Sequence, residues 1–323
     1  METPQTVAVV NSHVRCPLCQ RAGKWVAIAR PDRRQNSTVY QLRCQACGNR
    51  VAAKVSGGKQ YRADHCAELK NEYTTLCHLH GAYTRHEDMG VLKPLGFIEA
   101  AGHGILVTQW FAGSDLARAA RQLDAAALAR AFRLAGEWLL QLHDADDEPR
   151  PCVDLGVTQK IDHLSKTYGD VLRCSARAQK ALELLATSGI KLATWKTRAV
   201  RIHGDFKPQN MLYDHSSCVG LDIHWGIIGA ATYDLAPFLN HLWMAIGGNH
   251  GAAALRRYQV AEEAFLRGYG ATGLLEGLRW VQLYFALCQL GSYRQRGRLS
   301  VVYANWQIMP LVRRLENQLR ESS

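Results

Sequence analysis

Short apolar stretches with strand composition occupy the first third of the chain, and helix-like spacing dominates the remainder. The strand-like stretches lie at 25–29, 39–42, 50–55, 95–99 and 104–108, separated by polar or glycine-containing turns. Farther along, apolar residues recur at intervals of three and four, a period typical of amphipathic helices. Helices are expected over 67–76, 124–143, 158–188 as one or two helices, 234–247, 253–268, 274–290 and 303–320. The pattern predicts a small β-rich part followed by a larger helical part.

A polar stretch interrupts the helical pattern at 203–210, where the sequence reads His-Gly-Asp-Phe-Lys-Pro-Gln-Asn. Two short strand-like stretches follow at 211–213 and 219–223, joined by a polar turn. Because a hairpin brings its two ends together, Asn210 and Asp222 are expected to meet. An amide oxygen and a carboxylate are both suitable ligands for a hard cation such as Mg²⁺.

The same stretch has the spacing of a protein-kinase catalytic loop, which reads H-R-D-x-x-x-x-N. Asp205 and Asn210 keep that separation, whereas Gly204 stands in place of the Arg. In this the segment resembles the aminoglycoside phosphotransferase and choline kinase-like family, and Tyr233-Asp234-Leu235-Ala236 is a further family-like feature. The resemblance implies an α+β, two-lobed protein-kinase-like fold with a β-rich N-lobe and a mainly helical C-lobe. It also implies ATP- and Mg²⁺-dependent phosphorylation of a hydroxyl.

Roles for individual residues follow from this resemblance. Asp205 would accept the proton of the acceptor hydroxyl, and Lys207 would lie near the γ-phosphate. Asn210 and Asp222 would hold Mg²⁺. His203 and Asp234 would have structural roles in holding the loop.

The N-lobe residues expected to bind ATP come from three places in the sequence. Lys54, on the strand-like stretch at 50–55, would contact the α- and β-phosphates, as a kinase β3 lysine does. A glutamate on the next helix should hold that lysine, and we expect Glu72, with Glu68 one turn earlier as the alternative. Gln109-Trp110-Phe111 resembles the hinge between kinase lobes, where main-chain groups bond adenine; the alternative is that the two aromatic residues belong to the core.

Four cysteines form two C-x-x-C pairs near the N-terminus: Cys16 with Cys19, and Cys44 with Cys47, separated by 24 residues. Such pairs on a hairpin predict a four-thiolate zinc ribbon, a closed coordination shell that marks a structural site. An iron centre, a redox pair or plain buried thiols are the alternatives.

No G-x-G-x-x-G precedes Lys54, and the ribbon occupies the place where a phosphate-covering loop is expected. The tip of the ribbon hairpin carries Arg33 and Arg34. We therefore predict that this hairpin replaces the glycine-rich loop and that one of these arginines contacts phosphate. The competing interpretation is an appended ribbon that recruits a partner. The expected organisation is a ribbon-like segment at 1–48, possibly part of the N-lobe, an N-lobe at 49–109 and a helical C-lobe at 110–323.

Charge and composition narrow the choice of partners. The 323 residues carry a net charge of +11, and residues 1–62 hold eleven Lys/Arg against two Asp/Glu. This excess favours an anionic partner, and nucleic-acid binding on a kinase-like scaffold is the alternative function. No apolar run is long enough to span a bilayer, and the N-terminus does not resemble a secretory signal, so a cytoplasmic location is expected.

The acceptor is expected to be a small neutral or anionic molecule. Residues 231–323, where this family often binds its acceptor, contain ten Arg and six Asp/Glu. This positive excess would repel a polycationic aminoglycoside. A sugar, glycolipid, nucleoside or phosphorylated metabolite is the expected acceptor.

Overall fold

The computed structural model describes residues 2–34, 36–57, 64–83, 87–145, 150–224, 226–247, 251–271 and 275–321. The chain forms two compact units. The first contains Met1–Gly113 and Val219–Asp222, and the second contains Ser114–Cys218 and Ile223–Ser323. No helix in these described ranges has both the length and the apolar character that a bilayer crossing requires.

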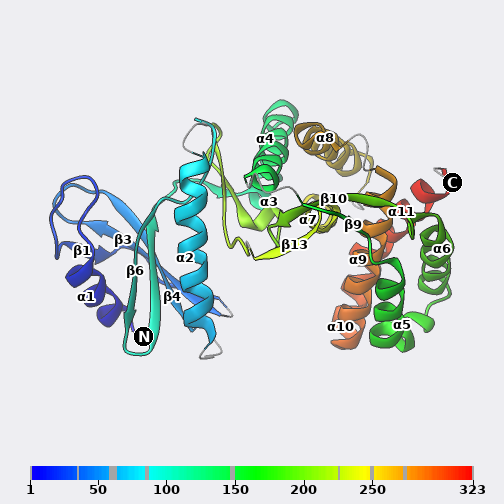
Figure 1. The fold of residues 1–323 in the computed structure, drawn as a ribbon, viewed down its shortest axis with the longest axis horizontal. Coiled ribbons are helices and arrows are strands. Elements are labelled where there is room, and N and C mark those ends of the chain that lie inside the picture. The colour runs from blue at the N-terminus through cyan, green and yellow to red at the C-terminus, as the bar shows by residue number, and fades with distance from the viewer. Residues whose placement is uncertain are drawn as a thin grey trace. The chain divides into compact units, whose positions relative to one another are not determined.

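The first unit is built on an antiparallel sheet of order β1-β3-β4-β7-β6, with β2 added beside β3. Figure 1 shows helix α2 lying along this sheet, against β6 and β7. The bounds are α1 Thr3–His13, β1 Trp25–Ala27, β2 Asp32–Arg33, β3 Ser37–Cys44, β4 Arg50–Ser56, α2 Asp64–Tyr83, β5 Met89–Val91, β6 Pro94–Ala100 and β7 His103–Gln109. Strand β4 alternates from Arg50 to Val55, with Val51, Ala53 and Val55 buried. Lys54 therefore points to the opposite face of the sheet.

Helix α1 was not expected from the sequence. Its Val10 is fully buried and lies in the same core cluster as Trp25 and Leu42 of the ribbon hairpin. The side chain of Asn11 clasps the start of β1, because its amide donates to Trp25 O (3.1 Å) and its oxygen accepts from Trp25 N (2.6 Å). Its short apolar run, Val7 to Val10, has no three-four period that would reveal a helix in the sequence, and it is tertiary packing that stabilises it.

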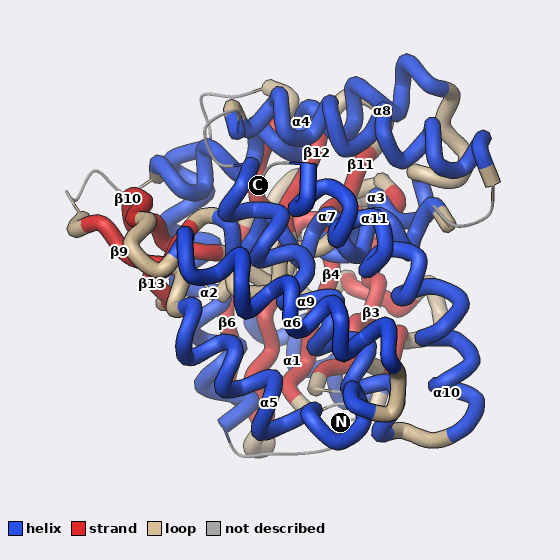
Figure 2. The backbone as a smooth tube through the Cα atoms, turned by 90° about the vertical axis from the view of Figure 1, so that its right-hand side faces the viewer, coloured by secondary structure: helices blue, strands red, loops and turns tan. Residues whose placement is uncertain are grey.

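The second unit is mainly helical. Its helices are α3 Leu116–Ala119, α4 Ala125–Asp144, α5 Val157–Arg173, α6 Ala176–Leu192, α7 Thr232–Ile246, α8 Ala252–Tyr269, α9 Leu275–Gln295, α10 Arg298–Tyr303 and α11 Met309–Glu321. In Figure 2 helices account for most of the backbone of this unit, and α9 packs against α5, α6, α7 and α11. Residues 158–188 thus form two helices, separated where the Ser175 side chain caps α6.

Short strands flank the loop at 203–210 and the turn at 214–217. They are β8 Ser114–Asp115, β9 Cys152–Asp154, β10 Lys196–Ile202, β11 Met211–Tyr213, β12 Cys218–Gly220 and β13 Ile227–Ala230. Strand β10 pairs with β13 on one side and β9 on the other. The Asp214 carboxylate accepts from the main-chain N–H groups of Ser216 and Ser217, which closes the polar turn between β11 and β12. The turn and the strand at 211–213 match the expectation, whereas the second strand ends earlier, at Gly220.

Candidate active site

One buried carboxylate fixes the loop after β10 through hydrogen bonds to its main chain. Asp234, near the start of α7, accepts from His203 N at 2.6 Å and from Gly204 N at 3.0 Å. Gly204 has φ +85°, and a Cβ there would meet the Cβ of His224 at 3.2 Å. Both the backbone conformation and this close approach explain why glycine stands where protein kinases have arginine.

A second layer of hydrogen bonds fixes Asp234 itself. The imidazole of His143, at the end of α4, lies 3.0 Å from Asp234 Oδ2 through Nε2 and 2.8 Å from Tyr269 Oη through Nδ1. A carboxylate can only accept, so Nε2 carries the hydrogen of the bond to Asp234. With the hydrogen on Nε2, Nδ1 can accept from the Tyr269 hydroxyl. His143 therefore positions the carboxylate that anchors the loop.

Aromatic rings support the same loop. Phe206 is buried and stacks on Phe238, with ring centroids 4.6 Å apart, and on Trp138 at 5.8 Å. The ring of His203 lies against Phe206 and Trp138 at 5.4 and 6.0 Å. This cluster agrees with a packing role for His203, and it makes the loop part of the core of the helical unit.

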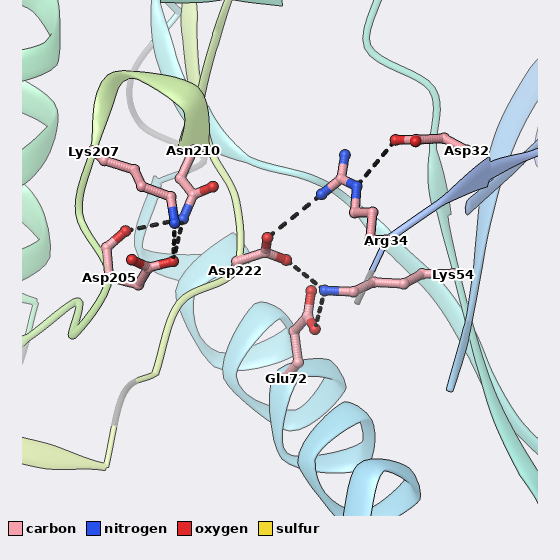
Figure 3. Close-up of polar contacts among 8 residues, drawn as sticks. All are labelled: Asp32, Arg34, Lys54, Glu72, Asp205, Lys207, Asn210 and Asp222. Carbon is pink, nitrogen blue, oxygen red and sulfur yellow. Dashed lines mark hydrogen bonds and ion pairs between the residues drawn. The ribbon is translucent and has the colours of Figure 1, made fainter. Parts of the chain in front are cut away.

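Three side chains of this loop meet, those of Asp205, Lys207 and the buried Asn210 (Figure 3). Lys207 Nζ lies 2.6 Å from Asp205 Oδ2, and Asn210 Nδ2 donates to the same oxygen at 3.0 Å and to Asp205 O at 2.9 Å. Because a main-chain oxygen can only accept, the amide nitrogen of Asn210 must face Asp205. Its amide oxygen is therefore the atom that could serve as a metal ligand. The Asp205 side chain is 45% exposed, so it is accessible to a substrate.

In the first unit, Lys54 lies between two carboxylates (Figure 3). Its ammonium is 2.7 Å from Glu72 Oε2 and also contacts Asp222 Oδ1. The glutamate at this contact is Glu72 rather than Glu68. Burial acts to lower the pKa of Lys54, but the two carboxylates outweigh it and raise that pKa. Asp222 has φ +54°, a conformation that costs a non-glycine residue energy and is found preferentially at functional sites.

A second cation from the ribbon hairpin reaches the same carboxylate. Arg34 Nη1 lies 3.6 Å from Asp222 Oδ2, and Arg34 Nε donates to Asp32 Oδ2 at 3.1 Å. Arg33, in contrast, lies on β2 and is exposed. The sequence placed both arginines at the tip but gave no signal for the pairing of Arg34 with Asp222, which lies 188 positions away.

The hinge segment follows β7 directly. The main-chain N–H of Gln109 donates to Lys93 O at 2.9 Å, and that of Trp110 donates to Arg50 O at 3.3 Å. These two amides are engaged within the unit. Trp110 and Phe111 are half-buried, so neither is a fully enclosed core residue.

The four ribbon cysteines converge on one point. All four Sγ atoms lie within 4.8 Å of one another, with Cys16–Cys47 at 3.5 Å and Cys19–Cys44 at 3.7 Å. A tetrahedral ion with Zn–S bonds of about 2.3 Å requires S–S separations of about 3.8 Å. The thiols therefore already have the arrangement of a four-thiolate metal site.

The two cysteine pairs have the same local geometry. Cys16 N donates to Arg21 O and Gln20 N donates to Cys16 O, while Cys44 N donates to Asn49 O and Gly48 N to Cys44 O. The fifth residue of each turn is left-handed, with φ +59° at Gln20 and +78° at Gly48. Gln20 adopts this conformation without being glycine, so the turn is imposed by its surroundings.

Comparison with known proteins places the chain in a family. Residues 49–272 match the phosphotransferase enzyme family. No curated protein shows significant sequence similarity to the chain. The comparisons give no support to the nucleic-acid partner that the basic N-terminal segment suggested.

Several solved structures share the fold. Choline kinase from Cryptosporidium parvum Iowa II matches with a TM-score of 0.59 at 10% identity, covering 99% of this chain and 97% of its own. Macrolide 2′-phosphotransferase MphH from Brachybacterium faecium matches with a TM-score of 0.55 at 16% identity, covering 95% and 97%. The amicoumacin kinase hAmiN, solved with AMP-PNP, Ca²⁺ and Ami, matches with a TM-score of 0.55 at 13% identity, covering 100% and 94%. The expected kinase-like fold is thereby confirmed, and the chain belongs to the phosphotransferase enzyme family.

Proposed function

We propose that this phosphotransferase transfers the γ-phosphoryl group of ATP, with Mg²⁺, to a hydroxyl of a small neutral or anionic molecule. The observation that carries the proposal is the Asp205 carboxylate, exposed at the surface of a loop that Asp234 and the aromatic cluster hold rigidly. Phosphoryl transfer depends chiefly on positioning and counter-charge, and a fixed carboxylate beside a cation provides both.

The proposed reaction is a displacement at the γ-phosphorus of ATP. The acceptor oxygen forms a bond to the γ-phosphorus, the bond to the bridging oxygen breaks, and ADP leaves. The proton of the acceptor hydroxyl passes to Asp205. Lys207 and Asn210 orient that carboxylate through the contacts to Oδ2. The Lys207 ammonium contacts the proposed base, Asp205. The role of Lys207 near the γ-phosphate stays a prediction.

The remaining candidate residues suit the binding of Mg²⁺ and of ATP. The Asp222 carboxylate and the amide oxygen of Asn210 are oxygen donors of the kind that Mg²⁺ prefers. When bound, Mg²⁺ neutralises charge on the phosphates. Lys54, held by Glu72, supplies a fixed positive charge for the α- and β-phosphates. The hinge residues Gln109 to Phe111 remain the proposed adenine contacts, through groups other than the two engaged amides.

Charges in the helical unit bear on the acceptor. Two of the arginines at 231–323 share one carboxylate, because Glu262 pairs with Arg279 at 2.6 Å and with Arg314 at 2.9 Å. These pairs leave the net positive charge of the segment unchanged, but they show that the net charge does not locate the positive surface. The argument for a neutral or anionic acceptor rests better on a local cluster.

That cluster surrounds Lys160 on α5. Its ammonium donates to Tyr233 Oη at 3.0 Å and lies 4.1 Å from the centroid of the Tyr233 ring and 5.4 Å from that of Tyr284. Burial lowers the pKa of Lys160, opposed by Cys288 and Asp154. Tyr233 directly precedes the loop anchor Asp234 in sequence. The charge of this lysine favours a sugar, nucleoside, glycolipid or phosphorylated metabolite over a polycationic aminoglycoside.

A turnover screen tests the proposal. The purified protein is incubated with ATP, Mg²⁺ and pools of sugars, nucleosides, phosphorylated metabolites, lipid-linked saccharides and aminoglycosides, and products carrying one added phosphoryl group are identified by mass spectrometry. Asp205→Asn serves as the control for contaminating kinases. Phosphorylation of aminoglycosides in preference to the other pools would overturn the acceptor class. Absence of any product from a protein that does not bind ATP would overturn the proposed activity.

We also propose that the four cysteines bind Zn²⁺. The S–S separations and the two matching turns support a tetrahedral thiolate site, which is closed and structural. Metal analysis of protein purified without added metal should give about one zinc per chain. One iron per chain, with the strong visible absorption of ferric thiolate, would assign the site to the alternative metal.

The cytoplasmic location that the sequence suggested also stays a prediction.

A further inference from the structure

We propose that the ribbon hairpin is the phosphate-covering element of the nucleotide site, with Arg34 binding the ATP phosphates and the cysteine-bound metal fixing the hairpin. This inference rests on the proposed ATP-dependent activity. It adds a nucleotide-binding residue and a role for the metal that neither the family match nor the fold supplies.

The hairpin is an integral part of the first unit. Strand β3 pairs with β4 along nearly its whole length, from Ser37 opposite Ser56 to Arg43 opposite Arg50. One continuous core cluster contains Cys16 and Trp25 of the ribbon together with Val107 of β7. The ribbon therefore shares both its sheet and its core with the strand that carries Lys54, as an appended module would not.

The tip of the hairpin lies at the charged side of this sheet. Val39 is the direct neighbour of Lys54 across the ladder, and Arg34 N donates to Ser37 O at 2.8 Å where the chain enters β3. Arg34 and Lys54 contact the two oxygens of the Asp222 carboxylate, Oδ2 and Oδ1 respectively. Arg34 thus joins Lys54, the proposed phosphate-binding lysine, at the carboxylate of the proposed Mg²⁺ ligand Asp222 (Figure 3).

The chemistry of Arg34 suits a triphosphate. A guanidinium presents several N–H donors in a planar fork that matches phosphate oxygens. The Arg34 side chain is 44% exposed and held by Asp32, so it is oriented but accessible. It supplies as a side chain the donors that a glycine-rich loop supplies from its backbone. Because Arg34 would contact the charged phosphates, its contribution to binding affinity should be present with ATP and absent with adenosine.

The metal site lies at the other end of the same strand. Strand β3 begins at Ser37 beside the tip and ends at Cys44, a predicted metal ligand, whose neighbour across the ladder is Trp25. At about 3.3 Å per residue the strand spans roughly 23 Å between these ends. Cys16 and Cys19 anchor the chain entering β1, so a metal that joins the two cysteine pairs fixes the twist and register of the hairpin. The direction of the tip depends on that clamp.

Binding measurements on the full-length, metal-loaded protein test the role of Arg34. ATP with Mg²⁺ and, separately, adenosine are titrated calorimetrically into wild type, Arg34→Met and the matched control Arg33→Met. Arg34→Met should weaken ATP binding about 10- to 50-fold, the range for losing a charge-assisted hydrogen bond. Adenosine affinity should stay within about twofold, and Arg34→Lys should restore part of the loss because it keeps the charge.

The outcomes separate this inference from the proposed function. A wild-type protein that binds no ATP contradicts the activity itself. A wild type that binds ATP, with Arg34→Met equal to it, overturns only the role of Arg34, as does an equal loss of adenosine affinity. A loss as large in Arg33→Met would show a general charge effect and would also overturn it.

The metal arm uses the same titration after chelation. Removing the metal should weaken ATP binding by the wild type about tenfold or more, the effect expected from losing the charge-assisted Arg34 contact. In Arg34→Met the weakening should be clearly smaller, because this variant has already lost that contact. Equal weakening in both proteins would show that the metal acts without Arg34 and would overturn the coupling. Retained circular dichroism of the metal-free protein serves as the check that the helical unit stays folded.

Discussion

Replacing Asp234 by asparagine removes the charge that anchors the catalytic loop while keeping the size of the side chain. Asp234 is 1% exposed and accepts from three groups: His203 N, Gly204 N and His143 Nε2. An asparagine offers one oxygen, so whichever way its amide turns, an N–H₂ group faces an N–H donor. At least one buried donor is then left without an acceptor.

The cost follows from these contacts. An unsatisfied buried donor costs about 1–3 kcal/mol, and the remaining bonds weaken because they are no longer charge-assisted. Since the site is buried, solvent screens little of this effect. We expect the free energy of unfolding of the helical unit to fall by about 2–4 kcal/mol. Activity should fall further, because a loop displaced by about 1 Å can lose ~10²-fold in rate.

Urea denaturation and amide hydrogen exchange measure the two effects without knowledge of the acceptor. Exchange should accelerate at the amides of His203 and Gly204, with little change in the first unit. Asp170→Asn, at a side chain that is 96% exposed, is the control. A stability and exchange pattern for Asp234→Asn that matches this control would refute the loop-anchor argument.

Three further predictions concern the loop and the sites around it. Asp205→Asn should keep the fold and ATP binding but lower turnover about 10²–10⁴-fold, and turnover within threefold of wild type in a coupled ADP assay would exclude Asp205 as the base. Asp222→Ala should abolish the Mg²⁺ dependence of nucleotide binding, measured with a fluorescent ATP analogue; an unchanged dependence would place the metal elsewhere. Burial, aided by Lys207, lowers the pKa of His241 to about 4, so the unfolded state binds its proton first and stability should fall as pH drops from about 6.5 to 4. His241→Asn should flatten this part of a pH–stability curve measured by urea denaturation, and an unchanged slope would contradict the assignment.

Much of the fold and of the loop could be predicted from local sequence. Period-two alternation at 50–55 and three-four spacing at 124–143 reflect which face of each element is buried, a property that neighbouring residues encode together. The spacing of Asp205 and Asn210 is equally local, because five residues of a tight loop fix their separation. The two C-x-x-C turns likewise carry their own geometry.

Tertiary structure decided the contacts between distant segments. Helix α1 is stabilised by packing under the ribbon and by the Asn11 clasp on Trp25, and its own amphipathic signal is weak. The choice of Glu72 over Glu68 as the contact of Lys54 depends on how α2 lies on the sheet. Nothing local distinguishes two glutamates one helical turn apart on the same face.

Electrostatic pairing was the least accessible to sequence. Net charge at 231–323 suggested a repulsive surface, but it did not show that two of those arginines share the single carboxylate of Glu262. At the ribbon tip the sequence offered two equivalent arginines, and only the folded chain brings Arg34 to Asp222 while Arg33 stays exposed. Coulomb interactions fall off with distance and with solvent screening. The effect of a charge is therefore set by neighbours that only folding brings together, whereas hydrophobic periodicity is already present in each segment before it folds.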